Sequence, residues 1–259
     1  MSISSTQFLR MDPLDPNSFH HKFSIVNGIT LHYVDEGEAR NGAIVLCHGF
    51  PDLWYGWRYQ IPFLVKKGYR VIVPDLRGFG QTDAPRCPPE KLQLYGIKNI
   101  CQDLVELTEQ LNIQKAIYCG HDWGGVVVWR MALYYPERVK SVISICTPYI
   151  PPRDRYYNIE TIARMIPTFQ YQIYLSHPKA EIELDSNAEA FFKGSMRTSK
   201  KEDEFKLFDG KIYLGNLNKV TRSSLISDKI TAGKDKVLGA EMTKDMSKDC
   251  SDLVIEDIG

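Results

Sequence analysis

Apolar and polar positions along the chain follow two alternating patterns, short continuous apolar runs and amphipathic stretches of helical period. A continuous apolar run covers residues 43–47, which is typical of a strand buried on both faces of a sheet, and further buried strands are predicted over 69–73, 116–119 and 139–146. Apolar residues recur at helical spacing in 54–65 and 97–111, which predicts two helices between these strands. The segments 22–26 and 29–34, joined by Asn27-Gly28, predict a β-hairpin. The alternation predicts an α/β fold with a mostly parallel sheet and helices on both faces.

The turn after the third apolar run is the most informative local feature. Gly120 and Gly124 lie two residues before and two residues after Asp122, and an apolar helix is predicted to follow. This spacing is typical of a nucleophile elbow, where strained backbone lifts the central side chain clear of the strand and a side chain two positions away would collide with the turn. Gly and Asp are also common in ordinary turns. An ordinary turn, however, does not predict the apolar strand before it or the apolar helix after it.

The residue at the centre of this turn indicates the chemistry. An ionised carboxylate needs no base to act as a nucleophile, and the helix N-terminus that follows Asp122 favours an anion. A carboxylate suits attack on carbon, as in opening an epoxide or displacing a halide, which leaves an ester on the protein. The loop 48–51 and the turn that starts at Asp75 also follow predicted strands. Because ligands of such sheets bind at the carboxyl ends of the strands, we expect these three loops to converge on one site.

Charge and composition exclude several classes of partner. The 259 residues carry a formal net charge of zero, which argues against nucleic acid and anionic membranes. No apolar run reaches membrane-spanning length, and residues 1–18 lack the apolar core of a secretory signal. The six cysteines form no CxxC pair or metal-ligand cluster, which predicts reduced thiols, a cytoplasmic location and neither metal nor cofactor. We expect residues 1–21 to form a loosely held arm.

The alternation of predicted strands and helices stops after residue 148. Residues 149–192 are rich in aromatic residues, isoleucine and short helical patterns, and residues 193–228 are charged and weakly patterned. A plain loop of this length is uncommon in a compact domain. We therefore predict a core in 22–148, an inserted and mostly helical cap in 149–228, and a second part of the core in 229–259.

Several motifs together resemble the epoxide-hydrolase branch of the α/β-hydrolase superfamily, soluble epoxide hydrolases in particular. The resemblance covers about residues 23–192 and resumes near residue 230. It rests on the elbow 120–125, the loop 48–51 with the sequence HGFP, the Gly-rich turn 75–82, the segment 171–174 with the sequence YQIY, and the loop 231–238.

The resemblance implies a role for each of these residues. Asp122 would attack a ring carbon of a small apolar epoxide, and Tyr171 would donate a hydrogen bond to the epoxide oxygen. Water would then hydrolyse the ester, with the backbone N–H groups of Phe50 and Trp123 as the oxyanion hole. Asp235 would orient a histidine. His48, Gly49, Pro51, Gly120 and Gly124 would shape the site, with His48 a loop-shaping residue rather than a base and Pro51 in a cis peptide.

The chain departs from the family pattern at two places. The family histidine follows the acid in sequence, and no histidine follows Asp235 here. The segment with a second epoxide-binding tyrosine is also missing, since Lys229 runs directly into the loop of Asp235, and the strand before that loop has few apolar residues. We therefore expect an internal deletion and a C-terminal truncation, a sheet that closes poorly from about residue 192 onward, and a reaction that stalls after the ester forms.

Two alternative functions stay open at this point. A haloalkane dehalogenase would share Asp122 and Trp123, but it needs a second halide donor near the oxyanion loop, often an Asn where this chain has Phe50. A catalytically inactive family member would follow from the missing histidine. The identity of the epoxide, the stereochemistry and the oligomeric state leave no signal in the sequence.

Overall fold

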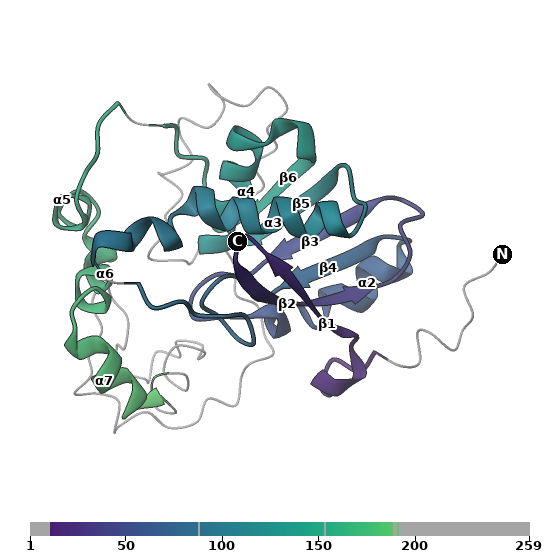
Figure 1. Cartoon of the computed structure of the whole chain (residues 1–259), viewed down its shortest axis with the longest axis horizontal. Helices are drawn as coiled ribbons and strands as arrows, with labels where there is room; N and C mark the ends of the chain where they lie inside the picture. Colours follow the sequence, from purple (N-terminus) through teal and green to yellow (C-terminus); the bar gives the residue numbers. More distant parts are fainter. Residues whose placement is uncertain (1–10, 88, 153, 189–190, 192–259) are drawn as a thin grey trace, which may run out of the picture. The chain divides into compact units, whose positions relative to one another are not determined.

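A computed structural model of the protein describes residues 11–87, 89–152, 154–188 and 191. The chain divides into two compact units, Met1–Tyr149 and Ile150–Gly259. Unit 1 contains a sheet whose described strands are arranged in the order β1-β2-β4-β3-β5-β6 (Figure 1). These strands are β1 (His21–Val26), β2 (Ile29–Glu36), β3 (Ala43–Cys47), β4 (Arg70–Pro74), β5 (Ala116–His121) and β6 (Val139–Ile145).

The pairing directions confirm the predicted sheet. β1 and β2 form an antiparallel hairpin, and β2 pairs antiparallel with β4. The strands β4, β3, β5 and β6 are parallel to one another. Both residues of the hairpin turn have positive φ, 44° at Asn27 and 76° at Gly28, as a tight two-residue turn requires. Since β3 lies between β4 and β5, the loops that follow these three strands meet at one edge.

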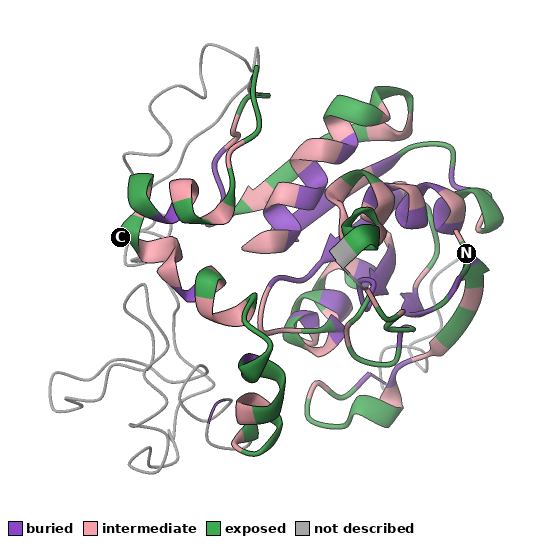
Figure 2. Cartoon of the chain, turned by 60° about the vertical axis from the view of Figure 1, so that its left-hand side comes forward, coloured by how far each residue is buried: buried purple, intermediate pink, exposed green. Residues whose placement is uncertain are grey.

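Two apolar cores cover the two faces of the sheet. β3 shows the division, because Val45 and Cys47 face one core while Ile44 and Leu46 face the other. The first core includes residues of α3 (Ile97–Gln110) and α4 (Trp123–Tyr134), and the second includes residues of α2 (Gln60–Lys66). The buried residues of unit 1 lie largely in the strands and on the inner sides of these helices (Figure 2).

The predicted helix over 54–65 is two elements instead of one. Trp54–Trp57 is a short 3₁₀ helix, labelled η2, and α2 begins only at Gln60. Trp54 and Trp57 are both buried against the same core as Ile61 of α2. The apolar spacing correctly identified the buried side, but it does not distinguish one helix from two short helical turns.

Two other sequence predictions for unit 1 are wrong. The strand β6 was expected to be buried, yet Ile143 is 47% exposed and the strand pairs only with β5 among the described strands. Residues 11–21 are not a loose arm, because Phe19 is buried against Trp54 and Met11 belongs to the same core. The apolar side chains of Met11 and Phe19 pack against residues that lie far away in sequence.

Unit 2 begins with short helices. They are α5 (Ile159–Met165), the 3₁₀ helix η5 (Pro167–Phe169), α6 (Gln170–Leu175) and α7 (Lys179–Asp185). The side chain of Asn158 caps α5 by accepting a hydrogen bond from Thr161 N, at 3.0 Å. The assignment of 149–228 as a cap stays a prediction. The strand expected before the loop of Asp235 and the second part of the core, 229–259, lie outside the described residues. The predicted poor closure of the sheet depends on these residues and stays a prediction.

Candidate active site

Asp122 lies between the end of β5 and the start of α4, in a backbone conformation with φ 54° and ψ −121°. L-residues rarely adopt positive φ, so the surrounding structure must hold this turn in place. Asp122 N donates to Ile145 O at 3.1 Å, and Asp122 O accepts from Gly125 N at 2.9 Å and from Thr147 Oγ1 at 2.6 Å. These bonds tie the turn to the end of β6 and to the first turn of α4.

Glycines surround Asp122 because the neighbouring backbone leaves no room for a side chain. A Cβ at Gly120 would overlap the carbonyl group of Gly124, and a Cβ at Gly124 would overlap the carbonyl group of Cys47. A Cβ at Gly49 would lie 2.5 Å from both Cβ and Oδ1 of Asp122. The elbow and the loop after β3 can therefore approach each other only through glycine.

The loop after β3 brings a hydrogen-bond donor to the Asp122 carboxylate. Phe50 N donates to Asp122 Oδ1 at 2.9 Å, and the Phe50–Pro51 peptide is cis. Trp123 is the first residue of α4, where backbone N–H groups have no acceptor within the helix. The local positive potential of these N–H groups stabilises negative charge on a carboxylate or on an oxyanion at this position.

His48 is fully buried, and both of its ring nitrogens are engaged by the backbone. Nδ1 lies 2.8 Å from Gly49 O, and Nε2 accepts from Leu76 N at 2.9 Å. The ring is therefore neutral, with its proton on Nδ1. Burial lowers the pKa of His48, which outweighs the hydrogen bond to Gly49 and the neighbouring carboxylates. These contacts support the predicted loop-shaping role.

Asp75, directly after β4, joins two loops of the site. Its Oδ1 accepts from Trp54 N at 2.9 Å, and its Oδ2 accepts from Gln81 N at 3.0 Å and from His32 Nδ1 at 2.8 Å. Burial alone would raise the pKa of Asp75, but the hydrogen bonds outweigh it and lower the pKa below its ordinary value. As predicted, the loops after β3, β4 and β5 converge at one edge of the sheet.

Two of the predicted catalytic residues belong to unit 2 and not to unit 1. Tyr171 lies on α6 in unit 2, where it is buried with its ring edge-to-face against Phe169. Asp235 lies outside the described residues. Their roles stay predictions. Thr147, in contrast, was missed as a site residue, although a hydroxyl residue directly after a predicted strand end was visible in the sequence.

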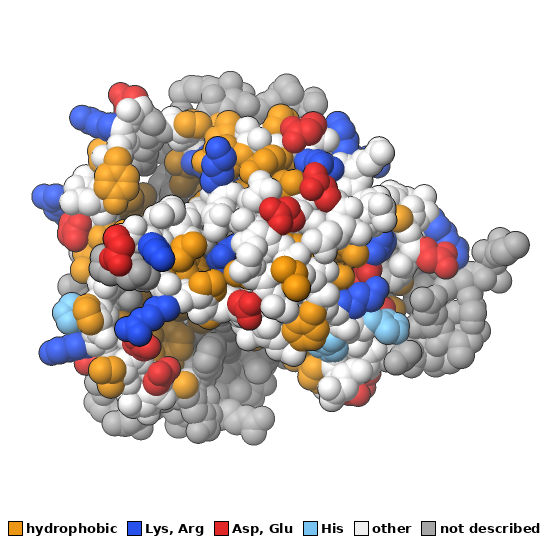
Figure 3. Space-filling view, in the orientation of Figure 1, with side chains coloured by type: hydrophobic (Ala, Val, Ile, Leu, Met, Phe, Trp, Pro, Cys, Tyr) orange, Lys and Arg blue, Asp and Glu red, His pale blue; other side chains and the backbone are white. Residues whose placement is uncertain are grey.

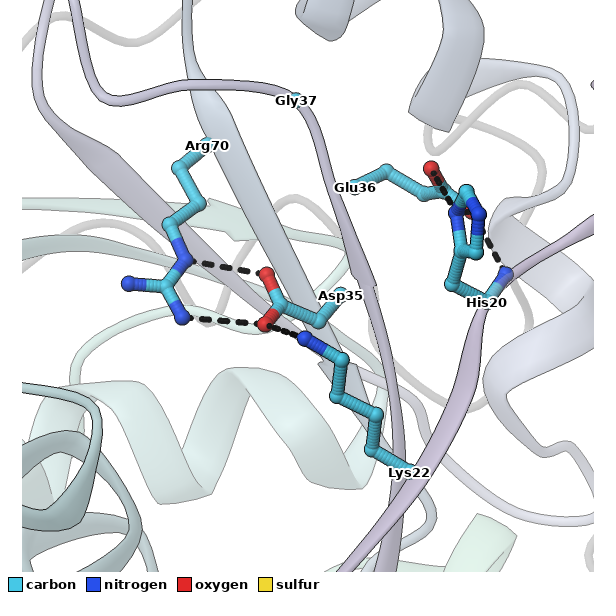
Figure 4. Close-up of a pocket in the computed structure, with 6 residues that line it drawn as sticks. All are labelled: His20, Lys22, Asp35, Glu36, Gly37 and Arg70. Atoms are coloured by element: carbon cyan, nitrogen blue, oxygen red, sulfur yellow. Dashed lines mark hydrogen bonds and ion pairs between the residues drawn. The ribbon is translucent and has the colours of Figure 1, made fainter.

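A second polar cluster lies at the opposite edge of the sheet, where β2 ends and β4 begins (Figure 4). Nε and Nη2 of Arg70 donate to the two carboxylate oxygens of Asp35, each at 2.9 Å, and Lys22 Nζ lies 2.7 Å from Oδ2. Burial raises the pKa of Asp35, but the bonds from Arg70 and Lys22 prevail and lower it. His20 is similarly paired with Glu36. These mutual pairs make the cluster an anchor for the β1–β2 hairpin.

Across the ranges given above, no three histidine, cysteine or acidic side chains are grouped so that they could hold a metal ion. Within the same ranges, no helix has both the length and the apolar character needed to cross a membrane.

Comparison with known proteins identifies the class. Residues 42–177 match the family model described as the alpha/beta hydrolase fold, and the chain belongs to this family. The structure is similar to the crystal structure of Epoxide Hydrolase A from Mycobacterium thermoresistibile, with a TM-score of 0.67 and 29% sequence identity. That match covers 89% of this chain and 75% of the other.

Similarity to individual proteins indicates which branch of the α/β-hydrolase family the chain resembles. The chain is 32% identical over 236 residues to epoxide hydrolase srdG of Neurospora crassa, which covers 85% of the chain and 68% of that protein. It is 43% identical over 202 residues to bifunctional epoxide hydrolase 2 of Rattus norvegicus, which covers 76% of the chain. Within the α/β-hydrolase family, the chain therefore belongs with the epoxide hydrolases. It spans only 35% of the length of the rat protein.

Proposed function

We propose that the protein opens small apolar epoxides by nucleophilic attack of Asp122. One carboxylate oxygen bonds to a ring carbon while the ring C–O bond breaks, and the epoxide oxygen takes a proton from a donor, for which Tyr171 is the candidate. The product is an ester between Asp122 and a hydroxyalkyl group. The observation that carries this proposal is the carboxylate at a strained elbow with the N–H of Phe50 on its Oδ1.

Release of a diol requires a second step. Water attacks the carbonyl carbon of the ester while a base takes a proton from the water, and the N–H groups of Phe50 and Trp123 stabilise the oxyanion. The bond between that carbon and the alkoxy oxygen then breaks, the alkoxy oxygen takes the proton from the base, and the diol leaves. In the family this base is a histidine oriented by an acid such as Asp235. All six histidines of the 259-residue chain precede Asp235. A carboxylate of ordinary pKa is a weak base for water near neutral pH. For the 259-residue polypeptide we therefore expect the ester to accumulate.

The test is intact-mass spectrometry after incubation of the 259-residue chain with a reactive epoxide. We expect a single adduct of the mass of the epoxide, and we expect Asp122→Ala to abolish it. Asp185→Ala is the matched control, because it makes the same change at an exposed carboxylate of α7. An adduct that persists in Asp122→Ala would refute the proposed nucleophile. Sustained diol formation would refute the stalled second step, and halide release from a haloalkane would favour the dehalogenase alternative.

A further inference from the structure

Asp75 stands at one end of a line of hydrogen-bonded side chains that leads away from the elbow. His32 Nδ1 lies 2.8 Å from Asp75 Oδ2, and His32 Nε2 lies 2.8 Å from His21 Nδ1. His21 Nε2 in turn lies 2.9 Å from the carbonyl oxygen of Pro16. His32 and Asp75 are completely buried. The line thus joins the segment before β1, the β1–β2 hairpin and the loop after β4.

Counting donors shows how many protons this line requires. A carboxylate and a backbone carbonyl only accept hydrogen bonds, so both ends of the histidine pair must donate. The contact between His32 and His21 needs one further proton. Three N–H protons on two imidazoles are one more than two neutral rings carry. A neutral pair would leave two acceptors facing each other at 2.8–2.9 Å in one of the three contacts.

Ring geometry supports a proton between the two histidines. The planes of His21 and His32 are inclined by only 19°, and their centroids are 5.1 Å apart. The centroid separation is about the sum of the N···N distance of 2.8 Å and the two distances from each centroid to its own nitrogen. The two centroids and the two nitrogens therefore lie nearly on one line, and the rings meet edge to edge instead of face to face. The lone pair of one nitrogen therefore points at the other, which is the geometry of an N–H···N hydrogen bond.

The negative charge of the Asp75 carboxylate also favours a third proton on the two histidines. A buried carboxylate is costly without a cation. The other cations of this region are engaged: Arg77 with Asp103, and Lys22 and Arg70 with Asp35. His20 is paired with Glu36. The uncharged rings of Phe23 and Trp54, the amide of Gln81 and the hydroxyl of Thr82 also contact His32. Within the described residues, His32 is thus the base recorded against Asp75, and it supplies a cation when the histidine pair carries the extra proton.

Asp75 connects the histidine pair to the loop after β3, residues 48–51, which carries Phe50 and is called the oxyanion loop here. Its Oδ1 holds Trp54 N, three residues after the cis proline of that loop, and the adjacent Leu76 N holds His48. Trp54 also packs edge-to-face against His21, with ring centroids 4.9 Å apart. A change at His21 can therefore reach Trp54 by two routes, through three hydrogen bonds by way of His32 and Asp75 or through the direct ring contact. From Trp54 it can pass along the backbone to Phe50, the donor on Asp122.

We propose that His21 and His32 share one excess proton, and that this cationic pair is the positioning group through which Asp75 holds the oxyanion loop against Asp122. The functional half of this inference rests on the role of Phe50 in the proposed function. The lowered pKa of Asp75 is consistent with it, since the carboxylate is then ionised at neutral pH.

The proton count can be measured on the free protein by NMR of the 259-residue chain with ¹⁵N-labelled histidine at pH 7. His21→Phe leaves His32 with the single N–H that Asp75 accepts. If the pair holds three protons, the substitution removes two ring N–H signals, whereas a neutral pair would lose one and would overturn the proposal. His20→Gln, one residue before β1, is the matched control, and we expect it to leave the signals of His21 and His32 unchanged.

The positioning role has two readouts. In His21→Phe, we expect the backbone amide signals of Phe50 and Trp54 to shift and the Asp122 adduct to form about tenfold more slowly, since small displacements of reacting groups are costly. His21→Gln restores a hydrogen-bond donor but no charge. It should behave like His21→Phe, whereas recovery would show that a neutral hydrogen-bond donor is sufficient and would overturn the role of the cationic pair. Unmoved amide signals of Phe50 and Trp54 would overturn the positioning role. An unreactive wild type would refute the proposed function alone, since the NMR results do not depend on turnover.

Discussion

At the scale of single residues, the site depends on atoms that cannot move apart. The methylene group of Asp122 fills the space in which a Cβ of Gly49 would lie, and the Phe50 N–H follows directly in sequence. The same crowding holds the carboxylate in one orientation and brings the donor to its Oδ1. The absence of a side chain at Gly49 and the reactivity proposed for Asp122 therefore depend on the same close contact.

Gly49→Ala tests this point. The added methyl group would lie 2.5 Å from Asp122, so the oxyanion loop must retreat and the Phe50–Asp122 hydrogen bond must lengthen. We expect the Asp122 adduct to form about 100-fold more slowly, measured by intact mass over time. Gly96→Ala is the control, because its added methyl group lies 3.2 Å from its nearest neighbour at the start of α3. Equal rates in both variants would contradict the crowding argument.

Asp35 supplies a pH-dependent part of the stability. Its pKa is lower in the folded protein than in the unfolded chain, so its contribution is complete above about pH 4 and disappears as the pH falls through the folded-state value. We expect Asp35→Asn to lower the free energy of unfolding by about 1–3 kcal/mol at pH 7, measured with urea. This difference should shrink below pH 4. Glu38→Gln, which removes a surface pair with Arg40, should change stability little at any pH.

At the scale of elements, a buried ion pair joins three segments. Arg77, in the loop after β4, donates to both oxygens of Asp103 on α3, and Asn27 of the hairpin turn donates to the same carboxylate at 2.7 Å. Burial raises the pKa of Asp103, against the opposing effect of Arg77 and Asn27. The pair therefore locks the hairpin, the loop and the helix together at the cost of desolvating two charges.

Removing one partner should be more harmful than removing both. Arg77→Met leaves the Asp103 carboxylate buried without its cation, and we expect a loss of about 3–5 kcal/mol in the free energy of unfolding. Arg77→Met combined with Asp103→Leu should recover part of this loss, because no buried charge remains. Chemical denaturation of the single and double variants measures both. A double variant that is less stable than Arg77→Met would contradict the argument that the loss comes from an unpaired buried charge.

At the scale of the whole molecule, opposite charges balance. The chain carries 32 basic and 32 acidic residues, and both signs are interspersed on the face shown in Figure 3. With a sequence pI near 7.0, the molecules repel one another least at neutral pH. β6 also exposes Ile143 and Ile145 on a strand that pairs on one side only among the described strands. Such edges favour association between chains.

Light scattering across pH tests this expectation. We expect self-association to be greatest near pH 7 and to decrease on either side. Ile143→Lys adds a charge at the β6 edge, whereas Ile182→Lys adds the same charge at an exposed position of α7. If the edge of β6 matters, Ile143→Lys should reduce association more than Ile182→Lys does. Equal effects would assign the change to net charge alone.

The sequence by itself determined the local features of this protein. The apolar runs located β3, β4 and β5, because a strand buried on both faces must be continuously apolar. The spacing of Gly120, Asp122 and Gly124 identified the elbow, since Gly120 and the carbonyl group of Gly124 crowd each other within the turn itself. These features depend on near neighbours in the chain, and the same local motifs carry the resemblance to the epoxide hydrolases.

Only the tertiary structure decided which distant groups meet. The bond from Thr147 to Asp122 and the line from Asp75 through His32 to His21 join residues 11 to 43 positions apart, and nothing in the local pattern of any one partner marks the others. The exposure of β6 and the burial of Phe19 likewise depend on which elements lie beside them. The pattern of apolar and polar residues indicates which side chains should be buried or hydrogen-bonded. The tertiary structure alone determines which residues they contact.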